Sequence, residues 1–269
     1  MQGSTAVILL NFCAKNPPHR QAENRCLQPK QTIMQKTFLT LFLVLFLTNV
    51  FGQKTEFRLA FNSGLFSFSG QSAEKYSQIN FSNPTNSGYT NNPYGSMVGI
   101  CYGLSGNLKR VTKKNLDLGL DLGFETLRSK VNITAISGYT GTSTYEYPAS
   151  GQTFLNYNFI NLFPYIGHRF SLRKVSLDIV GGFDIAYCLK ATEKGNASAT
   201  NGTKYTTSVD RKTISTDIRP RIQFSLDYQK TGIYIGYSYG LANYKSGYVG
   251  GTNECYARLL RFGLTYRLK

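Results

Sequence analysis

The sequence predicts an all-β fold, an eight-stranded antiparallel up-and-down transmembrane β-barrel with short turns at one end and long loops at the other. Three observations predict it. Apolar and polar residues alternate with a period of two through eight segments, which gives each strand one apolar and one polar face. The connections between the segments alternate between short and long, as in outer-membrane barrels. Only 16% of the 269 residues are charged and 14% are aromatic, whereas soluble domains are about 25% charged.

The eight segments are, in chain order, residues 57–62, 98–105, 116–125, 153–170, 175–187, 217–228, 233–241 and 260–268. The clearest is 116–125, where every even position is a large apolar residue and every odd position is Asp, Glu or Gly. A helix with this sequence would spread its carboxylates over all faces, so only a strand gives it a consistent apolar side.

The fourth segment has two sets of large apolar residues of opposite parity, namely Phe159, Phe163 and Tyr165 against Ile160, Leu162 and Ile166. A bulge and a strand buried on both faces are both open here. Pro164 in this segment and Pro220 in a later one each remove a donor from the strand ladder, so their exact register is open as well.

The connections divide into two classes. Residues 109–115, 171–174 and 229–232 are short and polar, and residues 69–95, 127–152, 190–216 and 243–255 are longer and rich in Asn, Ser, Thr, Gly and Tyr. In outer-membrane barrels the turns are periplasmic and the loops lie outside. An even number of strands then puts both termini on the periplasmic side.

A soluble lipocalin-like barrel or a β-sandwich is the alternative fold. Its polar face would meet water and carry Lys, Glu and Thr, but here that face is rich in Gly, Ser, Ala and Asp, which suits the crowded interior of a narrow barrel. Aromatic residues at strand ends fit the interfacial girdles of membrane barrels. These residues are Tyr102, Phe170, Tyr187, Tyr228, Tyr256 and Tyr266.

The chain before the first strand predicts targeting to the envelope. Residues 34–52 have the charged start and apolar run of a secretory signal peptide, with cleavage expected before Gln53. The apolar run, residues 38–51, is too short for the ~20 residues of a spanning helix. Residues 1–33 do not fit a signal peptide, so we expect Met34 to be the true start or residues 1–33 to be a disordered extension. A single barrel domain then covers residues 53–269 in the Gram-negative outer membrane.

The net charge of +16 first suggests a nucleic-acid partner. Residues 1–52 hold five of the 30 basic and one of the 14 acidic residues, which leaves 25 against 13, or +12. Seven basic residues fall in or beside two of the short turns, namely Lys109, Arg110, Lys113, Lys114, Arg169, Arg173 and Lys174. Others fall in the outer loops, and none forms a stripe interleaved with stacking aromatics. We therefore expect no nucleic-acid partner.

Eleven charged residues fall on the polar, inward face of the predicted strands. They are Asp117, Asp121, Glu125, Asp178, Asp184, Asp217, Arg219, Arg221, Asp227, Arg261 and Arg267. Buried charges cost several kcal/mol unless they are paired, so we interpret them as an Arg–carboxylate network that fills the barrel. A selectivity lining and a proton-binding cluster are the functional alternatives.

The sequence offers no catalytic, cofactor or metal signature. His168 is the single His after residue 52, and it lies beside a turn with no evident nucleophile. Cys101, Cys188 and Cys255 do not cluster with His as zinc ligands do, and an odd number of Cys gives no closed disulfide framework. We expect the chain not to be an enzyme.

Residues 158–170 read NFINLFPYIGHRF, and after a short basic turn residues 175–189 read VSLDIVGGFDIAYCL. This pair of segments resembles the outer-membrane beta-barrel domain family, the PorT-like group, in which an aromatic strand with a Pro runs into a Gly-rich strand. The resemblance covers residues 53–269, including the terminal strand that ends in YRLK. It implies an outer-membrane location, with outer-membrane lipid and lipopolysaccharide around the barrel and the barrel-assembly machinery as a partner.

We expect a structural or binding role in the envelope, with the lumen plugged by paired charges. A narrow porin-like channel for small solutes and an accessory component of a secretion machine, with an envelope protein as partner, are the alternatives. The outer connections carry Tyr among Asn, Ser and Gly, a composition that suits adaptable binding surfaces. These are Tyr76, Tyr89, Tyr94, Tyr139, Tyr145, Tyr147, Tyr205, Tyr244 and Tyr248.

Overall fold

A computed structural model describes residues 54–82, 87–139, 142–248 and 253–269. The expected extension 1–33, the signal peptide 34–52 and its cleavage point lie outside these residues. The described strands are β1 (Lys54–Ser69), β2 (Tyr76–Ser82), β3 (Ser87–Thr90), β4 (Met97–Val111), β5 (Leu116–Tyr139), β6 (Thr144–Leu172), β7 (Val175–Ala199), β8 (Lys204–Asp210), β9 (Thr216–Tyr228), β10 (Thr231–Tyr239) and β11 (Tyr256–Arg267). Within the described part of the chain, no helix is long and apolar enough to cross a membrane.

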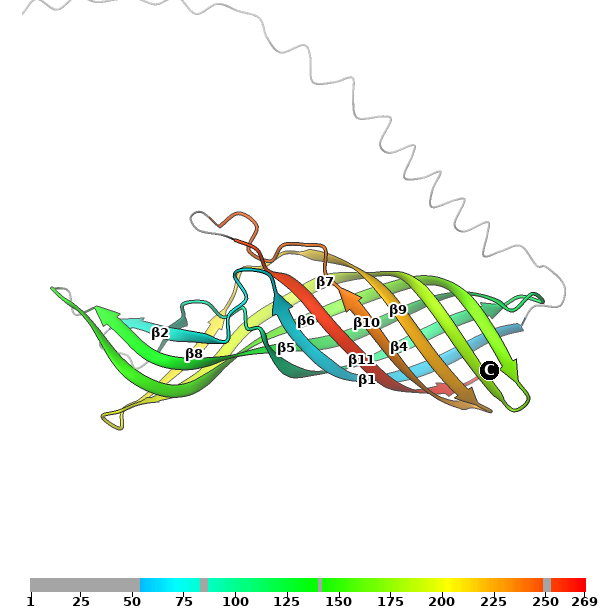
Figure 1. The fold of residues 1–269 in the computed structure, drawn as a ribbon, viewed down its shortest axis with the longest axis horizontal. Coiled ribbons are helices and arrows are strands. Elements are labelled where there is room, and N and C mark those ends of the chain that lie inside the picture. The colour runs from blue at the N-terminus through cyan, green and yellow to red at the C-terminus, as the bar shows by residue number, and fades with distance from the viewer. Residues whose placement is uncertain (1–53, 83–86, 140–141, 249–252) are drawn as a thin grey trace, which may run out of the picture. The chain divides into compact units, whose positions relative to one another are not determined.

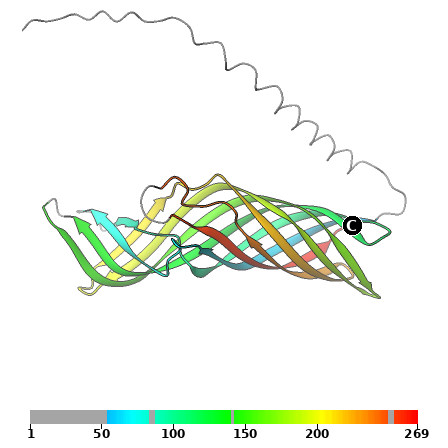
Figure 2. The ribbon, with the colours of Figure 1, turned by 45° about the horizontal axis from the view of Figure 1, so that its top comes forward.

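Eight strands pair through antiparallel ladders that close on themselves, in the order β1, β4, β5, β6, β7, β9, β10, β11 and back to β1. We call this closed set the main ring. Following the paired residues once around it from Asp178 in β7 leads back to that strand at Cys188, a stagger of ten residues. A stagger of this kind requires tilted strands, and Figure 2 shows them crossing the ring obliquely.

Each of the eight segments predicted from the sequence overlaps one strand of the main ring, and only 233–241 and 260–268 extend past their strands, by two residues and one residue. The three short connections are also found, as turns at residues 112–115, 173–174 and 229–230. Asn115, Arg173 and Gln229 have positive φ in these turns. We call this end of the main ring the turn end.

The expectation of long loops is wrong for most of residues 127–152 and 190–216, and for the strands β2 and β3 within residues 69–95. Strands β5, β6 and β7 have 24, 29 and 25 residues and continue past their ring neighbours (Figure 1). Beyond the main ring, β2 pairs with β3 and, in parallel, with β5, while β8 pairs with β7 and, in parallel, with β3. These pairings close a second ring of six strands, β2, β5, β6, β7, β8 and β3, which we call the extension.

The two faces of β6 are now distinct. Phe159, Phe163 and Tyr165 point into the main ring and are buried, whereas Ile160, Leu162 and Ile166 lie on its outer face. The sequence left this parity open because both sets are large and apolar. The ladder between β6 and β7 is interrupted after Leu162 and resumes at Tyr165, on either side of Pro164.

Three apolar clusters lie inside the described strands, and the smallest consists of Phe163, Tyr165 and Val180 in the main ring. The first occupies the main ring near the extension, where the ring of Phe68 packs edge-on against Tyr94, Tyr157 and Tyr244 with centroids 5.0–5.9 Å apart. The second fills the extension. Its buried members are Ile79, Phe81, Val131, Ile133, Ile136, Ala197, Ala199 and Tyr205. Tyr94, Tyr205 and Tyr244, which we expected on loop surfaces, are therefore core residues.

Candidate functional site

The interior of the main ring toward the turn end is polar and carries the candidate site, a buried network of ions. The network has two layers. The turn-side layer contains Glu56, Arg58, Lys109, Asp117, Arg169, Asp178, Asp227 and Arg267. The central layer contains Glu125, Asp184, Asp217, Arg219 and Arg261, with Arg221 and Asp121 beside them.

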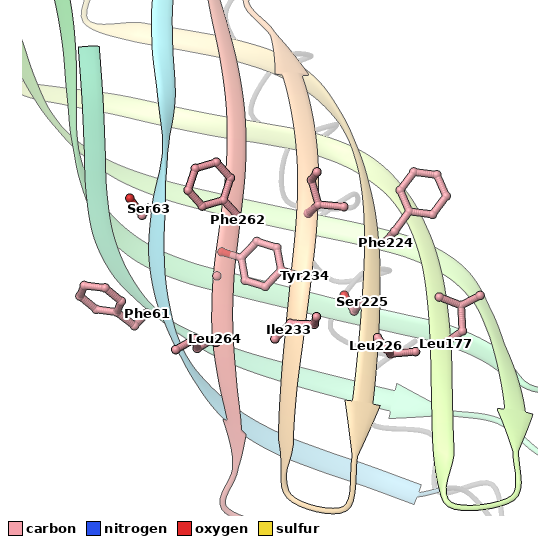
Figure 3. A pocket seen from close by; sticks show the side chains of 12 residues that line it. Phe61, Ser63, Leu177, Phe224, Ser225, Leu226, Ile233, Tyr234, Phe262 and Leu264 are labelled. Carbon is pink, nitrogen blue, oxygen red and sulfur yellow. The ribbon is translucent and has the colours of Figure 1, made fainter. Parts of the chain in front are cut away.

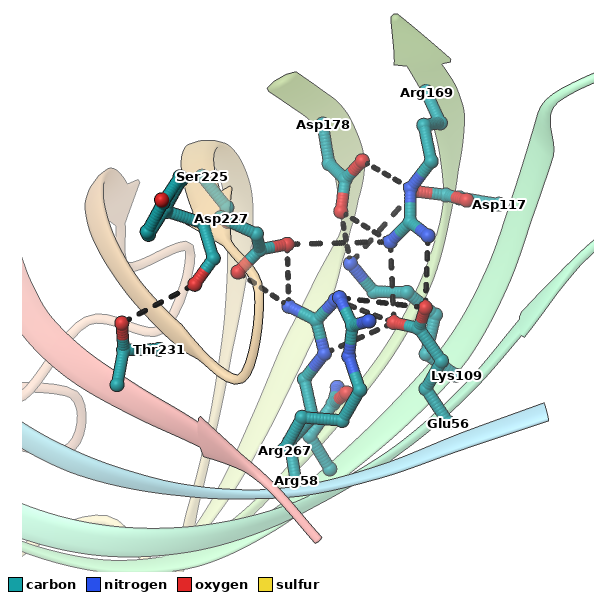
Figure 4. Close-up of polar contacts among 12 residues, drawn as sticks. Glu56, Arg58, Lys109, Asp117, Arg169, Asp178, Ser225, Asp227, Thr231 and Arg267 are labelled. Atoms are coloured by element: carbon teal, nitrogen blue, oxygen red, sulfur yellow. Dashed lines mark hydrogen bonds and ion pairs between the residues drawn. The ribbon is translucent and has the colours of Figure 1, made fainter. Parts of the chain in front are cut away.

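Two arginines connect the carboxylates of the turn-side layer (Figure 4). Arg169 donates to Glu56 through Nη1 at 2.9 Å and to Asp178 through Nε at 2.7 Å and Nη2 at 2.9 Å. Arg58 donates to Glu56 and places Nη1 2.8 and 2.7 Å from the two oxygens of Asp227. Charge-assisted bonds of this kind are the strongest hydrogen bonds in proteins, so they join β1, β6, β7 and β9 across the ring.

The remaining members complete the charge balance of the turn-side layer. Lys109 donates to Asp178 and lies 3.7 Å from Asp117, and Arg267 lies 3.5 Å from Glu56. Neither oxygen of Asp117 has a hydrogen bond, so this carboxylate is held by charge alone. Four buried or partly buried cations balance the four carboxylates, and the exposed Lys54 also lies 3.4 Å from Glu56.

Glu125 is the centre of the second layer. Arg219 Nη2 lies 2.8 Å from its carboxylate, and Arg261 donates to it through Nε and Nη2 at 2.9–3.1 Å. Asp184 accepts from Arg261 and lies 3.6 Å from Arg219 Nε. Asp217 accepts from the Tyr244 hydroxyl at 2.9 Å, which links this layer to the aromatic core.

Arg221 and Asp121 are held by neutral groups. The guanidinium of Arg221 lies 4.2 Å from the ring centroid of Phe163, a cation–π contact, and it donates to Gln223. Asp121 accepts from the side-chain amide of Asn107. Among the described residues, neither Arg221 nor Asp121 has an ion pair within 4.0 Å.

All eleven charged residues predicted from the sequence point into the main ring. Ten are buried, and Arg267 is partly exposed at the turn end. The structure brings nine of them into ion pairs, and Arg221 and Asp121 are the other two.

Four further members of the network were missed, namely Glu56, Arg58, Lys109 and Arg169. The expectation that Lys109 and Arg169 belong to the turns is wrong, because β4 and β6 run further than predicted and bury both side chains. A signal was present. Lys109 continues the odd-numbered polar face of β4, and Arg169 continues the odd-numbered inward face of β6.

The other chemical groups considered in the sequence lie apart from this network. His168 is on the outer face of β6 with its ring 4.8 Å from that of Phe170. Cys101, Cys188 and Cys255 are free thiols. The described residues contain no group of three or more His, Cys, Asp or Glu side chains placed to hold a metal ion.

The outer face of the main ring is apolar. Every strand contributes exposed large side chains, for example Leu59, Phe61, Ile100, Leu104, Leu122, Phe124, Ile160, Ile166, Phe183, Ile185, Ile222, Phe224, Ile233, Ile235, Phe262 and Leu264. A groove of about 560 Å³ crosses this face over β9, β10 and β11, between Phe224, Ile233 and Phe262 (Figure 3).

No family model and no curated protein matches the chain, so the resemblance to the PorT-like group stays a prediction. Several solved structures are similar to this chain. Neisserial surface protein A has 10% identity and a TM-score of 0.33, covering 79% of this chain and 98% of its own. Ail of Yersinia pestis, in complex with the heparin analogue sucrose octasulfate, has 12% identity, a TM-score of 0.33 and coverages of 80% and 99%. The translocator domain of autotransporter NalP from Neisseria meningitidis has 11% identity and a TM-score of 0.24, and the match covers 88% of this chain and 96% of the translocator domain. These structures are outer-membrane β-barrels.

Proposed function

We propose that the main ring is an eight-stranded transmembrane β-barrel of the bacterial outer membrane, with a closed lumen and a structural or binding role in the envelope. The observation that carries this proposal is a reversal of polarity along β5, β6 and β7. From the turn end to Phe124, Ile160 and Tyr187 their outer faces are apolar. Beyond these residues, in the last part of the main ring and in the extension, their outer faces are mostly polar.

The reversal is sharpest in β5. On the outer face Leu122 and Phe124 are followed by Thr126 and Arg128, while the strand keeps its parity. On the inner face Glu125 is followed by Leu127. Both faces therefore change character within three residues, although the backbone continues as one strand.

The reversal occurs at the same height on three neighbouring strands. Phe124 pairs with Ile160, which pairs with Tyr187, and all three are exposed apolar or aromatic residues. In the next outward-facing row, Thr126 pairs with Asn158, which pairs with Lys190. A boundary that follows the hydrogen-bonded rows across strands is the edge expected where the surroundings change from lipid to water.

Water alone does not account for the outer face of the main ring. Soluble monomers rarely expose apolar patches larger than a few hundred Å², yet here such residues encircle all eight strands. In lipid the same residues need no partner, and closure of the ladders satisfies the backbone. Phe170, Tyr228 and Tyr266 near the turn end are about half exposed and would form an interfacial girdle.

The closed lumen is supported by the neutral turn-side layer, the central layer around Glu125 and the aromatic core beyond it. Together these side chains occupy the ring from the turn end to the extension. A narrow channel would need a continuous wet path past Arg219 and Arg261, both of which are fully buried. Outer-membrane lipid, lipopolysaccharide and the barrel-assembly machinery are the surroundings and partners that this proposal implies.

The proposal is tested by fractionation and by electrophoresis with and without boiling. A membrane barrel stays in the outer-membrane fraction and migrates faster before boiling than after it. A soluble protein with no mobility shift would refute the barrel.

Conductance in planar bilayers tests the closed lumen separately. We expect the native chain to be silent and Arg219→Ala to conduct, with the boiling shift used to verify that the variant is folded. Solute-sized conductance of the native chain would favour the narrow channel. A folded Arg219→Ala barrel that does not conduct would show that Arg219 is not required to close the lumen.

A further inference from the structure

We infer that the outer wall of β5, β6 and β7, directly beyond the polarity boundary, binds the phosphoryl groups of a lipid headgroup. We call this surface the cationic wall, and its members are Arg128, Lys130, Asn156, Asn158, Lys190 and Lys194. The inference rests on the proposed membrane barrel and names one ligand class for its surface.

The cationic wall is a regular grid of cross-strand neighbours. Arg128 pairs with Asn156, and Lys130 pairs with Phe154, which pairs with Lys194. Directly opposed side chains on adjacent strands have Cβ atoms about 4.5–5.5 Å apart. Lys130 and Lys194 are two strands apart, roughly 10 Å at the usual strand spacing, and Arg128 is the next outward-facing residue to Lys130 on β5. These three cations can therefore contact one headgroup that carries more than one phosphate.

Arg128 is held in place before any ligand binds. Its Nε donates to Asn156 Oδ1 at 2.7 Å, and its guanidinium carbon lies 5.4 Å from the ring centroid of Phe154. Among the described residues neither Nη atom has a partner, so one edge of the guanidinium is free. Two parallel N–H groups on that edge match the oxygens of a phosphate.

The wall carries more positive than negative charge. Lys190 lies 3.2 Å from Asp210, but both side chains are more than half exposed, and such pairs are weak. Arg128, Lys130 and Lys194 have no ion pair in the part of the chain that the structure describes. Three cations are thus available to an anionic ligand.

The position of the wall selects a lipid over a soluble anion. The outward-facing residues just below it, Phe124, Ile160 and Leu189, are apolar and 43–51% exposed. Lys190 lies in the first outward-facing row above this belt and Arg128 in the second. Lys130 and Lys194 lie in the third row. Long Lys and Arg side chains extend toward the level of the lipid phosphates, where each cation adds roughly 1 kcal/mol of attraction. A phosphorylated glycolipid of the outer leaflet is the ligand that this geometry fits.

The test uses the full chain folded in detergent, with binding measured by native mass spectrometry. The probes are bisphosphorylated lipid A and the same lipid with both phosphates removed. We expect tighter binding of the phosphorylated lipid, and a loss on the order of 10- to 100-fold in Arg128→Gln/Lys130→Gln/Lys194→Gln. Arg128→Lys keeps the charge and removes the paired N–H groups, so its affinity for the phosphorylated lipid should lie between those of the wild type and the triple variant.

The matched control removes three exposed cations from the turn end, as Lys113→Gln/Lys114→Gln/Lys174→Gln. We expect less than about a threefold effect there, because these residues lie at the opposite end of the strands. Equal losses in the two triple variants, or equal binding of the two lipids, would overturn the inference. Inorganic pyrophosphate competing as well as lipid A would overturn the assignment to a lipid.

The boiling shift is recorded for every variant. A wild-type chain without the shift contradicts the membrane barrel itself. A chain that shows the shift but does not discriminate between the two lipids contradicts only the cationic wall.

Discussion

The main ring and the extension share strands β5, β6 and β7, yet the two regions have opposite polarity. In the main ring β5 to β7 turn Leu and Ile outward and Asp, Glu and Arg inward, and in the extension they turn Ile and Val inward and Lys, Asn and Thr outward. The strands do not break at the change. Alternation with period two therefore defines two faces, and the proposed change of medium from lipid to water explains why a different face is apolar in each region.

The two regions are also stabilised differently. The extension buries apolar side chains from water, which is the ordinary hydrophobic contribution to folding. Toward the turn end the interior of the main ring instead depends on ion pairs and hydrogen bonds between its charged side chains, because a buried unpaired charge costs several kcal/mol. Substitutions of the same kind should therefore have unequal effects in the two regions.

The largest expected effect is the loss of a carboxylate from the central layer. Glu125→Gln leaves Arg219 and Arg261 with one fewer counter-charge, and we expect it to lower the free energy of unfolding by about 3–5 kcal/mol. Urea unfolding in lipid vesicles measures this.

The matched change in the extension is Glu193→Gln. Glu193 accepts from Thr90 N and Arg211 Nε, each at 2.7 Å, but Arg211 is partly exposed. Water can solvate that arginine, so we expect Glu193→Gln to lower the free energy of unfolding by only about 1–3 kcal/mol. Equal losses at Glu125 and Glu193 would contradict the difference in solvation between the two interiors.

The next largest difference is expected when a charged residue is introduced on the outer face of each region. Leu122→Arg places a cation against lipid and should cost about 2–4 kcal/mol in vesicles. Thr134→Arg, on the exposed outer face of the extension, should change stability by less than about 0.5 kcal/mol. If Leu122→Arg is as harmless as Thr134→Arg, the main ring is not surrounded by lipid.

A smaller effect is expected from removing one methylene group. Ile133 is buried in the extension core, so Ile133→Val should cost about 0.5–1.5 kcal/mol. Ile166 faces outward from the main ring, and lipid chains can fill the space left by Ile166→Val, so its cost should be below about 0.5 kcal/mol. Hydrogen exchange of β2 and β5 measures the local loss of stability caused by Ile133→Val. A larger loss of stability in Ile166→Val than in Ile133→Val would contradict the assignment of the inner and outer faces.

The smallest effect concerns Cys255, which precedes β11 at the boundary of the aromatic core. Burial raises the pKa of its thiol to about 12. The neutral thiol is therefore the dominant form at every pH below that value, and it reacts poorly. We expect no alkylation of Cys255 by iodoacetamide at pH 8 without urea and full alkylation with it, as followed by peptide mass spectrometry. Rapid labelling of the folded chain would mean that the core opens.

The strands of the main ring could be predicted because residues such as 116–125 alternate without interruption. The extension was missed for a physical reason. Beyond residue 125 the alternation continues with Leu127, Val131 and Ile133 inward, but the water-facing positions are Thr, Arg, Lys and Asn, which on their own resemble a loop. Half of the residues in a strand with one face in water are polar, so the composition of such a strand resembles that of a loop.

The inward position of the eleven predicted charges followed from parity alone, and their partners did not. Arg169 and Glu56 are 113 residues apart, and they meet because the ring closes with a particular stagger. That stagger is the sum of many ladder registers, none of which is fixed by local sequence. Lys109 was missed because a basic residue near a turn looks like a solvated one.

The unbroken passage of β5 to β7 from the main ring into the extension has a mechanical consequence. Residues 126–139 of β5 provide roughly 45 Å of continuous strand at ~3.3 Å per residue, cross-linked to β6 along nearly its whole length. If the main ring spans the membrane as proposed, the ladders continue across the membrane surface from the main ring into the extension. A force applied to the end of the extension would then be transmitted through covalent bonds and hydrogen-bonded ladders to the part in the membrane, which would limit how far the extension can tilt.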